Sequence, residues 1–267
     1  MCLIAWNWQP GSTLPLLVLA NRDEFYARPT RALHAWPCGQ VLAGKDEQAG
    51  GTWLGLGHNA PGIRFAAITN FRDVSQLRPD AQSRGELVPE FLRSQESSKA
   101  YLARLRPTAN RYNPFNLLVF DGAQLRGFES HSGRTVTLEP GLGAVSNAGF
   151  NTPWPKLLQL KQALARLDTQ GRPPTQRLLQ LLADQSPVDD TDLPSTGLPL
   201  ERERALATVF VRSADYGTRA SSVVLVRGQS AELLEQSFDA QGSTGLQQLS
   251  TSIPGGETGF ARSWRGN

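Results

Sequence analysis

The sequence has few thiols and imidazoles, and this scarcity excludes several kinds of site. Its 267 residues include two cysteines, Cys2 and Cys38, and three histidines, His34, His58 and His131. Two cysteines cannot build a disulfide framework or a thiolate zinc site, and the histidines lack metal-ligand spacing. A single Cys2–Cys38 bridge is the one disulfide that the sequence allows. A reducing compartment and no bound metal are the simpler expectations.

Long apolar runs and blocks of one charge are also missing. The longest apolar stretch near the start, Leu14 to Ala20, is too short to span a bilayer, and no basic segment like that of a signal peptide precedes it. A net charge of +3 is too small for the footprint of a nucleic-acid binder. We therefore expect a cytoplasmic protein without a membrane span and without a nucleic-acid partner.

Two common catalytic loops do not occur in the sequence. There is no Gly-x-Ser-x-Gly elbow and no Gly-x-x-x-x-Gly-Lys phosphate loop. The glycine-rich run Gly50-Gly51-Thr52-Trp53-Leu54-Gly55 leads into an apolar strand and not into a helix, so it lacks the helix dipole that phosphate sites use. The run is typical of a turn that feeds a strand.

Hydrophobic alternation predicts strands in the first half of the chain and again near its end. The expected strands are 3–8, 14–20, 51–56, 64–69, 116–120, 125–129, 135–138, 207–212, 221–227 and 233–238. Helical patterns cover 87–93, 97–105, 156–167 and 175–183, and 184–200 is expected to be a surface loop. Without regular βαβ alternation, this order predicts an α+β fold with largely antiparallel sheets. We expect one domain over 1–244 and a poorly ordered Gly/Ser-rich tail over 245–267.

The second residue of the chain has the chemistry of a nucleophile. Cys2 comes directly before an apolar run, and removal of Met1 would leave a thiol and a free α-amine on one carbon. An α-amine titrates at about 7.7–8.0 and a thiol at about 8.5, so the amine can accept the thiol proton near neutral pH. Position alone does not distinguish this from an incidental second residue.

Four polar clusters lie at the ends of apolar strands, where their side chains can converge over one edge of a sheet. The clusters are Asn21-Arg22-Asp23-Glu24, Thr69-Asn70-Phe71-Arg72, Ser146-Asn147 and Tyr216-Gly217-Thr218-Arg219. Any one of them is explained by ordinary turn chemistry, because Asn and Asp favour turns. All four together with Cys2 favour a site.

These runs, with Met1-Cys2-Leu3-Ile4, the run from Gly50 to Gly55 and Thr152-Pro153-Trp154-Pro155-Lys156, resemble the NRDE family of transport and Golgi organisation proteins. The resemblance extends from residue 2 to about residue 226. It implies a link to haem mobilisation and to acyl-CoA or lipid handling, without an agreed reaction.

More distantly, the arrangement is similar to N-terminal-nucleophile hydrolases of the choloylglycine hydrolase and penicillin V acylase type. That resemblance implies a four-layer αββα sandwich with Cys2 as nucleophile and Asp23 as the carboxylate that positions its amine. Asn147 and Asn70 would flank the oxyanion, and Arg219 would match a late active-site arginine.

The resemblance is incomplete at one position. The hydrolases have an arginine three residues before the aspartate, where this chain has Ala20. Arg22 is one replacement, and a different substrate is the other explanation. We expect the binding site to include Arg22, Glu24, Trp53 and Arg72, while an Arg22–Glu24 ion pair is the structural alternative.

Two functions from different classes follow. The first is an N-terminal-cysteine amide or thioester hydrolase that acts on a small acylated substrate and requires no cofactor. The alternative is a non-catalytic carrier of haem, acyl-CoA or lipid that uses the same pocket, with Cys2 or a histidine as the axial ligand of a haem. A third interpretation, a protein whose polar loops are only structural, fits the motifs least well.

Overall fold

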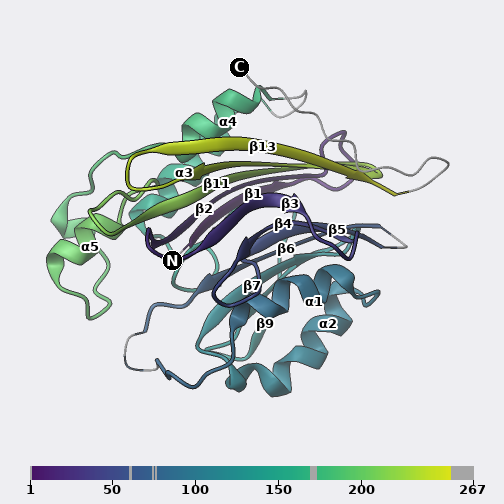
Figure 1. Cartoon of the computed structure of the whole chain (residues 1–267), viewed down its shortest axis with the longest axis horizontal. Coiled ribbons are helices and arrows are strands. Elements are labelled where there is room, and N and C mark those ends of the chain that lie inside the picture. The colour runs from purple at the N-terminus through teal and green to yellow at the C-terminus, as the bar shows by residue number, and fades with distance from the viewer. Residues whose placement is uncertain (1, 60–61, 74, 76, 169–172, 254–267) are drawn as a thin grey trace.

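The computed structural model describes residues 2–59, 62–73, 75, 77–168 and 173–253, which form two antiparallel sheets (Figure 1). Sheet A has the order β10 (Gly141–Val145), β1 (Cys2–Trp8), β2 (Leu16–Phe25), β11 (Tyr216–Arg227), β12 (Ser230–Phe238) and β13 (Ser243–Ser252). Sheet B has the order β3 (Thr30–Ala35), β4 (Val41–Asp46), β5 (Leu54–Asn59), β6 (Gly62–Asn70), β7 (Phe115–Phe120), β8 (Leu125–Glu129) and β9 (Arg134–Thr137).

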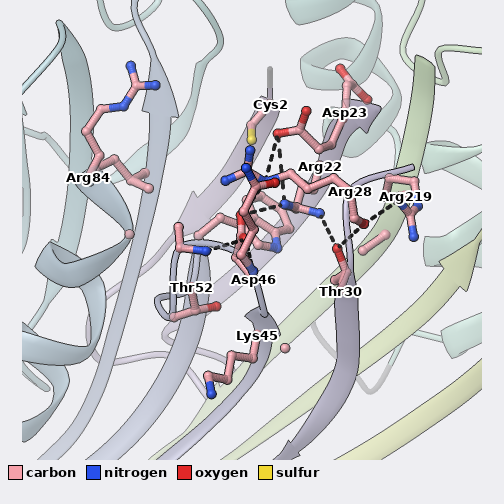
Figure 2. Close-up of a pocket in the computed structure, with 18 of the residues that line it drawn as sticks. Cys2, Arg22, Asp23, Arg28, Thr30, Lys45, Asp46, Thr52, Arg84 and Arg219 are labelled. Atoms are coloured by element: carbon pink, nitrogen blue, oxygen red, sulfur yellow. Dashed lines mark hydrogen bonds and ion pairs between the residues drawn. The ribbon is translucent and has the colours of Figure 1, made fainter. Parts of the chain in front are cut away.

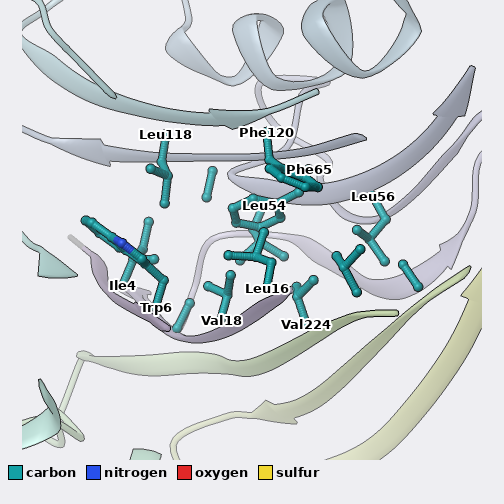
Figure 3. Packing of buried hydrophobic residues seen from close by; sticks show 14 of the residues in the cluster. Ile4, Trp6, Leu16, Val18, Leu54, Leu56, Phe65, Leu118, Phe120 and Val224 are labelled. Atoms are coloured by element: carbon teal, nitrogen blue, oxygen red, sulfur yellow. The ribbon is translucent and has the colours of Figure 1, made fainter. Parts of the chain in front are cut away.

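The main core lies between the sheets. Alternate residues of β1 and β2, such as Ile4, Trp6 and Val18, meet Leu54 and Phe65 of sheet B (Figure 3). Each large side chain buried in this way contributes about 1.5–3 kcal/mol. Because successive side chains of a strand point to opposite faces, the other residues of β1 and β2 face away from sheet B.

Helices cover the outer face of each sheet, so that the layers run helix, sheet, sheet, helix (Figure 1). On sheet B lie α1 (Leu87–Arg93), preceded by η2 (Arg84–Glu86), and α2 (Ser98–Leu105), which is followed by η3 (Arg106–Arg111). On sheet A lie α3 (Pro155–Ala165) and α4 (Thr175–Leu182). The η4 turn (Asp190–Asp192) and α5 (Leu200–Leu206) lead into β11. The mixed α/β class with mainly antiparallel sheets is as predicted.

Close packing at the edge of sheet A requires a glycine. Gly143 of β10 pairs with Trp6 of β1, and a Cβ at Gly143 would lie 2.2 Å from the indole Cζ2 atom. The Trp6 ring therefore lies flat over the β10 backbone and packs edge-on against Phe150. This contact joins the first strand of the chain to the segment that carries Ser146 and Asn147.

Several predicted boundaries were wrong. The Asn21–Glu24 tetrad does not follow a strand but lies inside β2, because β1 and β11 both pair with its backbone. Likewise, residues 216–219 belong to β11 and are not a turn between two strands. Residues 207–212 form no strand, and the predicted loop over 184–200 contains only the short η4 turn before α5 begins at its last residue.

The predicted tail also begins too early. Residues 245–252 belong to β13, which pairs with β12 along its length and packs Leu249 against the main core. The alternation is weak there because β13 is an edge strand with mostly polar side chains. Residues 254–267 of the predicted tail lie outside the described residues. The sequence analysis also missed β3, β4 and β10.

Candidate functional site

A cavity of about 780 Å³ opens at the end of the sheets where β1 begins and β2 and β6 end. Its lining includes Cys2, Asp23, Glu24, Asn70 and Arg84. The labelled view shows Cys2, Arg22 and Asp23 close together, with Arg84 set apart from them (Figure 2). The lining is predominantly charged and polar, which suits a polar ligand better than a purely apolar one.

Cys2 is fixed at this cavity by strand pairing on one side and by a side-chain hydrogen bond on the other. It pairs with Arg22 of β2, and its backbone carbonyl accepts a 3.0 Å hydrogen bond from the Ser146 hydroxyl. The side chain is 7% exposed, and burial raises the pKa of the thiol. A buried thiol needs a nearby base to become a nucleophile at neutral pH.

The β2 tetrad divides its side chains between the two faces of sheet A. Asn21 and Asp23 share the face of Leu17 and Leu19, which the helices cover, whereas Arg22 lies on the face toward sheet B. Asn21 is structural, because its Nδ2 donates to the carbonyls of Leu182 and Val209, both at 2.8 Å, and its Oδ1 accepts from Ser221.

Asp23 is a buried carboxylate beside the start of the chain. Asp23 directly follows Arg22, the residue of β2 that pairs with Cys2. Asp23 Oδ1 accepts a 2.8 Å hydrogen bond from the Thr218 hydroxyl, and its backbone carbonyl accepts one from the Tyr216 hydroxyl. Burial raises the pKa of Asp23, and the positive charge of Lys156 opposes this rise.

The two asparagines expected at the oxyanion are brought together. Asn147 Nδ2 donates a 2.9 Å hydrogen bond to the backbone carbonyl of Asn70. Ser146, whose hydroxyl donates to the Cys2 carbonyl, comes directly before Asn147, so Asn147 follows β10 near the start of β1. The primary amide of Asn147 has two N–H donors, and this hydrogen bond uses one of them.

Arg22 and Glu24 belong to an ion-pair network between the sheets. Arg22 donates to Asp46 and to the Thr30 hydroxyl, both at 3.2 Å, and lies 4.0 Å from Glu24. Arg28 donates to the same Asp46 carboxylate at 2.7 Å. Burial alone would raise the pKa of Asp46, but these donors hold it below its ordinary value. Arg22 therefore ties β2 to β4 at the wall of the cavity.

Three further predicted residues have different surroundings. Arg219 lines the cavity and donates to the backbone carbonyls of Phe238, Phe25, Tyr26 and Arg28 at 2.9–3.1 Å. Trp53 is half-buried in the lining. Arg72 is buried, donates to Glu203 at 2.8 Å and stacks over the Trp154 ring. Arg219 thus holds the loop after β2, and Arg72 holds α5.

Lys156 is a site residue that sequence reasoning left without a role. It lies in the first turn of α3, is 1% exposed, and burial lowers the pKa of its ammonium to about 8. Cations are disfavoured at a helix N-terminus, where the dipole is positive. That conflict, visible in the run Trp154-Pro155-Lys156, is the signal that could have identified it.

The glycine-rich run shapes the far wall of the cavity. Gly51 lies so close to η2 that a Cβ would be 2.3 Å from the carbonyl oxygen of Gly85, and Thr52 N–H donates to the same oxygen. The contact fixes Arg84, whose guanidinium donates to the Pro114 carbonyl at 3.1 Å. Among the described residues, none of the acidic groups lies within ion-pair distance of Arg84.

The described residues contain no group of three or more His, Cys, Asp or Glu side chains that could hold a metal ion. Over the same residues, no helix is long and apolar enough to cross a membrane. Cys2 is the one thiol or imidazole in the described lining of the cavity. The many charged groups around it fit the apolar face of a haem poorly.

Sequence comparisons place the chain among known proteins. The profile of the family described as Transport and Golgi organisation 2 matches residues 1–240. The chain is 36% identical to the Transport and Golgi organization protein 2 homolog of Bos taurus over 248 residues, which are 85% of this chain and 88% of that protein. It is 32% identical to the Homo sapiens homolog and 29% identical to the Drosophila melanogaster protein, with the same shares covered.

Proposed function

This chain belongs to the Transport and Golgi organisation 2 family, and from the geometry of its cavity we propose that it is an N-terminal-cysteine hydrolase. The substrate class would be a small molecule with an amide or thioester bond. The observation that carries the proposal is the position of Cys2 and Asp23 in the lining of one cavity, with Asp23 next to the β2 residue that pairs with Cys2.

The proposed reaction begins after removal of Met1. The free α-amine of Cys2 accepts the proton of its own thiol, and the sulfur attacks the substrate carbonyl carbon. The carbonyl π electrons move to oxygen, which becomes an oxyanion. The ammonium then returns its proton to the leaving amine or thiol as the bond between the carbonyl carbon and the leaving group breaks. The acyl group stays on Cys2 as a thioester. Water attacks this thioester with the amine again as base and restores the free thiol.

The neighbouring residues supply the groups that such a reaction requires. The second N–H of the Asn147 amide and the side chain of Asn70 are the donors proposed for the oxyanion. One such donor contributes about 3 kcal/mol to lowering the barrier. Asp23, held by Thr218, would orient the amine. Arg219 and Arg22 would shape the cavity, since backbone carbonyls and Asp46 occupy their guanidinium groups.

The layer order supports a likeness to N-terminal-nucleophile hydrolases. Those enzymes are built as αββα sandwiches, and helices here cover the outer faces of two stacked antiparallel sheets (Figure 1). In this chain the first strand lies inside sheet A with its first residues at a cavity, as an N-terminal nucleophile requires. This likeness of layers is the reason for preferring a hydrolase to a carrier.

The test combines the mass of the purified chain with turnover. We expect a chain that begins at Cys2, and release of acid from a panel of N-acyl amino acids and acyl thioesters. Cys2→Ala should abolish this release, while Cys38→Ala should retain it, because Cys38 is exposed on the surface. A purified active chain that still carries Met1 would contradict the mechanism. Tight binding of the panel without turnover would favour the alternative, a carrier of acyl-CoA or lipid.

A further inference from the structure

Lys156 holds its ammonium in the interior of the protein without the contacts that usually accompany a buried charge. Its side chain is 1% exposed, and the Nζ atom has no hydrogen-bond acceptor within the described part of the chain. Burying a charge is costly unless it is paired and hydrogen-bonded. A lysine that only filled space here could be replaced by methionine at lower cost, so the charge calls for another explanation.

Lys156 and Asp23 lie in the same layer. Leu157 and Leu160, which follow Lys156 in α3, pack on Leu17 and Leu19 of β2. Asp23 is on the same face of β2 as Leu17 and Leu19. Of the charges that lower the pKa of Asp23, that of Lys156 acts most strongly. The ammonium and the carboxylate therefore lie on the same face of sheet A, the face that α3 covers.

We propose that Lys156 is a positioning residue that balances the charge of Asp23, so that the α-amine of processed Cys2 stays unprotonated near neutral pH. The inference rests on the proposed hydrolase function. A lone buried carboxylate beside the amine would stabilise its ammonium form and so raise the pKa of the amine. An ammonium has no lone pair with which to accept the thiol proton. The charge of Lys156 cancels that stabilisation.

The other charged and titratable groups around this pair do not supply the same balance. Arg72 faces Asp23 from the end of β6, but Glu203 of α5 pairs with it at 2.8 Å. Tyr216 of β11 faces Asp23, and burial raises the pKa of its phenol, so it is neutral. Cys2 itself lies on β1, and burial raises the pKa of its thiol.

Two charged neighbours remain, both on β2. Arg22 and Glu24 lie toward sheet B, where Arg22 pairs with Asp46 and lies 4.0 Å from Glu24. Of the positively charged groups named here, all among the described residues, Lys156 is thus the one that can balance the negative charge of Asp23. Because burial lowers its pKa to about 8, the balance holds at neutral pH and fails as Lys156 loses its proton at higher pH.

The pH dependence of Cys2 alkylation tests the inference without a substrate. The parent chain would carry Cys38→Ala, so that Cys2 is its single cysteine, and mass spectrometry would verify loss of Met1. Iodoacetamide rates would be measured from pH 5 to 10 for the parent, Lys156→Met, Lys156→Arg and the double variant Asp23→Asn/Lys156→Met. Lys161→Met is the matched control, since Lys161 lies on the same helix and donates to Asn151 at the surface.

We expect Lys156→Met to move the midpoint of the rate profile about one pH unit toward alkaline values, which is about a tenfold lower rate at pH 7. Lys156→Arg keeps the positive charge and should stay near the parent midpoint. The double variant removes both charges and should return toward that midpoint. Lys161→Met should leave the profile unchanged. If Lys156→Met does not fold, Lys156→Gln, a neutral residue of similar reach, takes its place.

The outcomes separate this inference from the proposed function. A parental midpoint in Lys156→Met would overturn the charge-balancing role, even if Cys2-dependent hydrolysis is found. The charge-balancing role would also be overturned if the double variant had the same shifted midpoint as Lys156→Met. Retention of Met1 in every preparation would contradict the proposed function, and the profile would then be measured on a chain released at Cys2 from a cleavable fusion.

Discussion

The Thr218 hydroxyl donates a 2.8 Å hydrogen bond to Asp23 Oδ1 across the β2–β11 pair, and Thr218 Oγ1 also accepts the backbone N–H of Val211 at 2.9 Å. One hydroxyl thus fixes the buried carboxylate and closes the segment that leads into β11. Thr218 is fully buried, so no solvent can replace either bond. The β-bulge between Thr218 and Ala220 aims this side chain at Asp23.

Thr218→Val keeps the shape of the side chain and removes both hydrogen bonds. We expect a loss of about 1.5–3 kcal/mol in the free energy of unfolding, because a buried carboxylate and a buried N–H each lose a partner. Under the proposed function, kcat should fall at least tenfold with little change in KM, since Asp23 would orient the amine and not the substrate. Chemical denaturation and steady-state kinetics measure the two effects. Thr218→Ser is the control and should stay near the parent in both.

Gly51→Ala should damage the wall of the cavity. The added Cβ would lie 2.3 Å from the Gly85 carbonyl oxygen, and backbone atoms cannot move aside as a side chain can. We expect a loss of about 1–3 kcal/mol from overpacking, measured by chemical denaturation. Gly62→Ala is the matched control, because Gly62, like Gly51, has no positive φ, and its added Cβ would meet no atom closer than 3.4 Å. An equal loss in both variants would mean that the loss of a glycine, not contact with Gly85, is responsible.

The sequence was enough to find the motifs of the site, but it did not show which of their residues face the site and which are structural. Strand alternation predicted strands over 3–8 and 14–20, and the β1–β2 pair that they form carries Cys2 and Asp23. The same alternation makes Asn21 and Asp23 face the helices, yet only tertiary contacts reveal that Asn21 binds the Leu182 and Val209 carbonyls. Those carbonyls are more than 160 residues away in the sequence.

Long-range pairing also explains the errors in the fold. Residues 216–219 carry turn-forming types, but pairing with β2 makes them a strand. The β10 strand is rich in glycine because Gly143 lies under the Trp6 ring, so its pattern is not that of an ordinary strand. Lys156 was part of a recognised run, but its burial depends on how α3 packs on sheet A. None of these contacts leaves a periodic signal in the local sequence.

Glu235 should give the protein a component of stability that decreases as pH rises. This carboxyl lies on β12 between the sheets, and its Oε1 accepts a 2.7 Å hydrogen bond from Leu33 N–H of β3. Burial raises its pKa above the ordinary value of 4.5. The folded state therefore holds the proton more tightly than the unfolded state, and stability falls as pH rises from about 4.5 through the folded pKa.

Glu235→Gln removes this dependence, because a neutral amide oxygen can still accept the Leu33 N–H. We expect the parent to lose stability relative to Glu235→Gln as pH rises through that window, measured by urea denaturation at a series of pH values. Leu33 N–H is retained in both chains, so the difference reports the titration alone. A difference between the two chains that does not change with pH would contradict the prediction, because it would show that the carboxyl has the same pKa in the folded and the unfolded state.

The buried Arg72–Glu203 pair should be more sensitive to single than to double substitution. Arg72 Nη1 lies 2.8 Å from Glu203 Oε2, and both side chains are about 5% exposed or less. Glu203→Gln leaves the guanidinium in the interior without a counter-charge, so we expect a loss of about 3–5 kcal/mol. Arg72→Met with Glu203→Leu removes both charges and should lose much less, because a buried ion pair contributes little beyond an apolar pair of similar volume. Denaturant midpoints of the parent, Arg72→Met, Glu203→Leu and the double variant complete the cycle, and Glu203→Gln is measured beside them. Because Glu203 Oε1 also accepts the backbone N–H of Thr196, a double variant as unstable as Glu203→Gln would mean that this hydrogen bond, and not the charge pair, holds α5 against the end of β6.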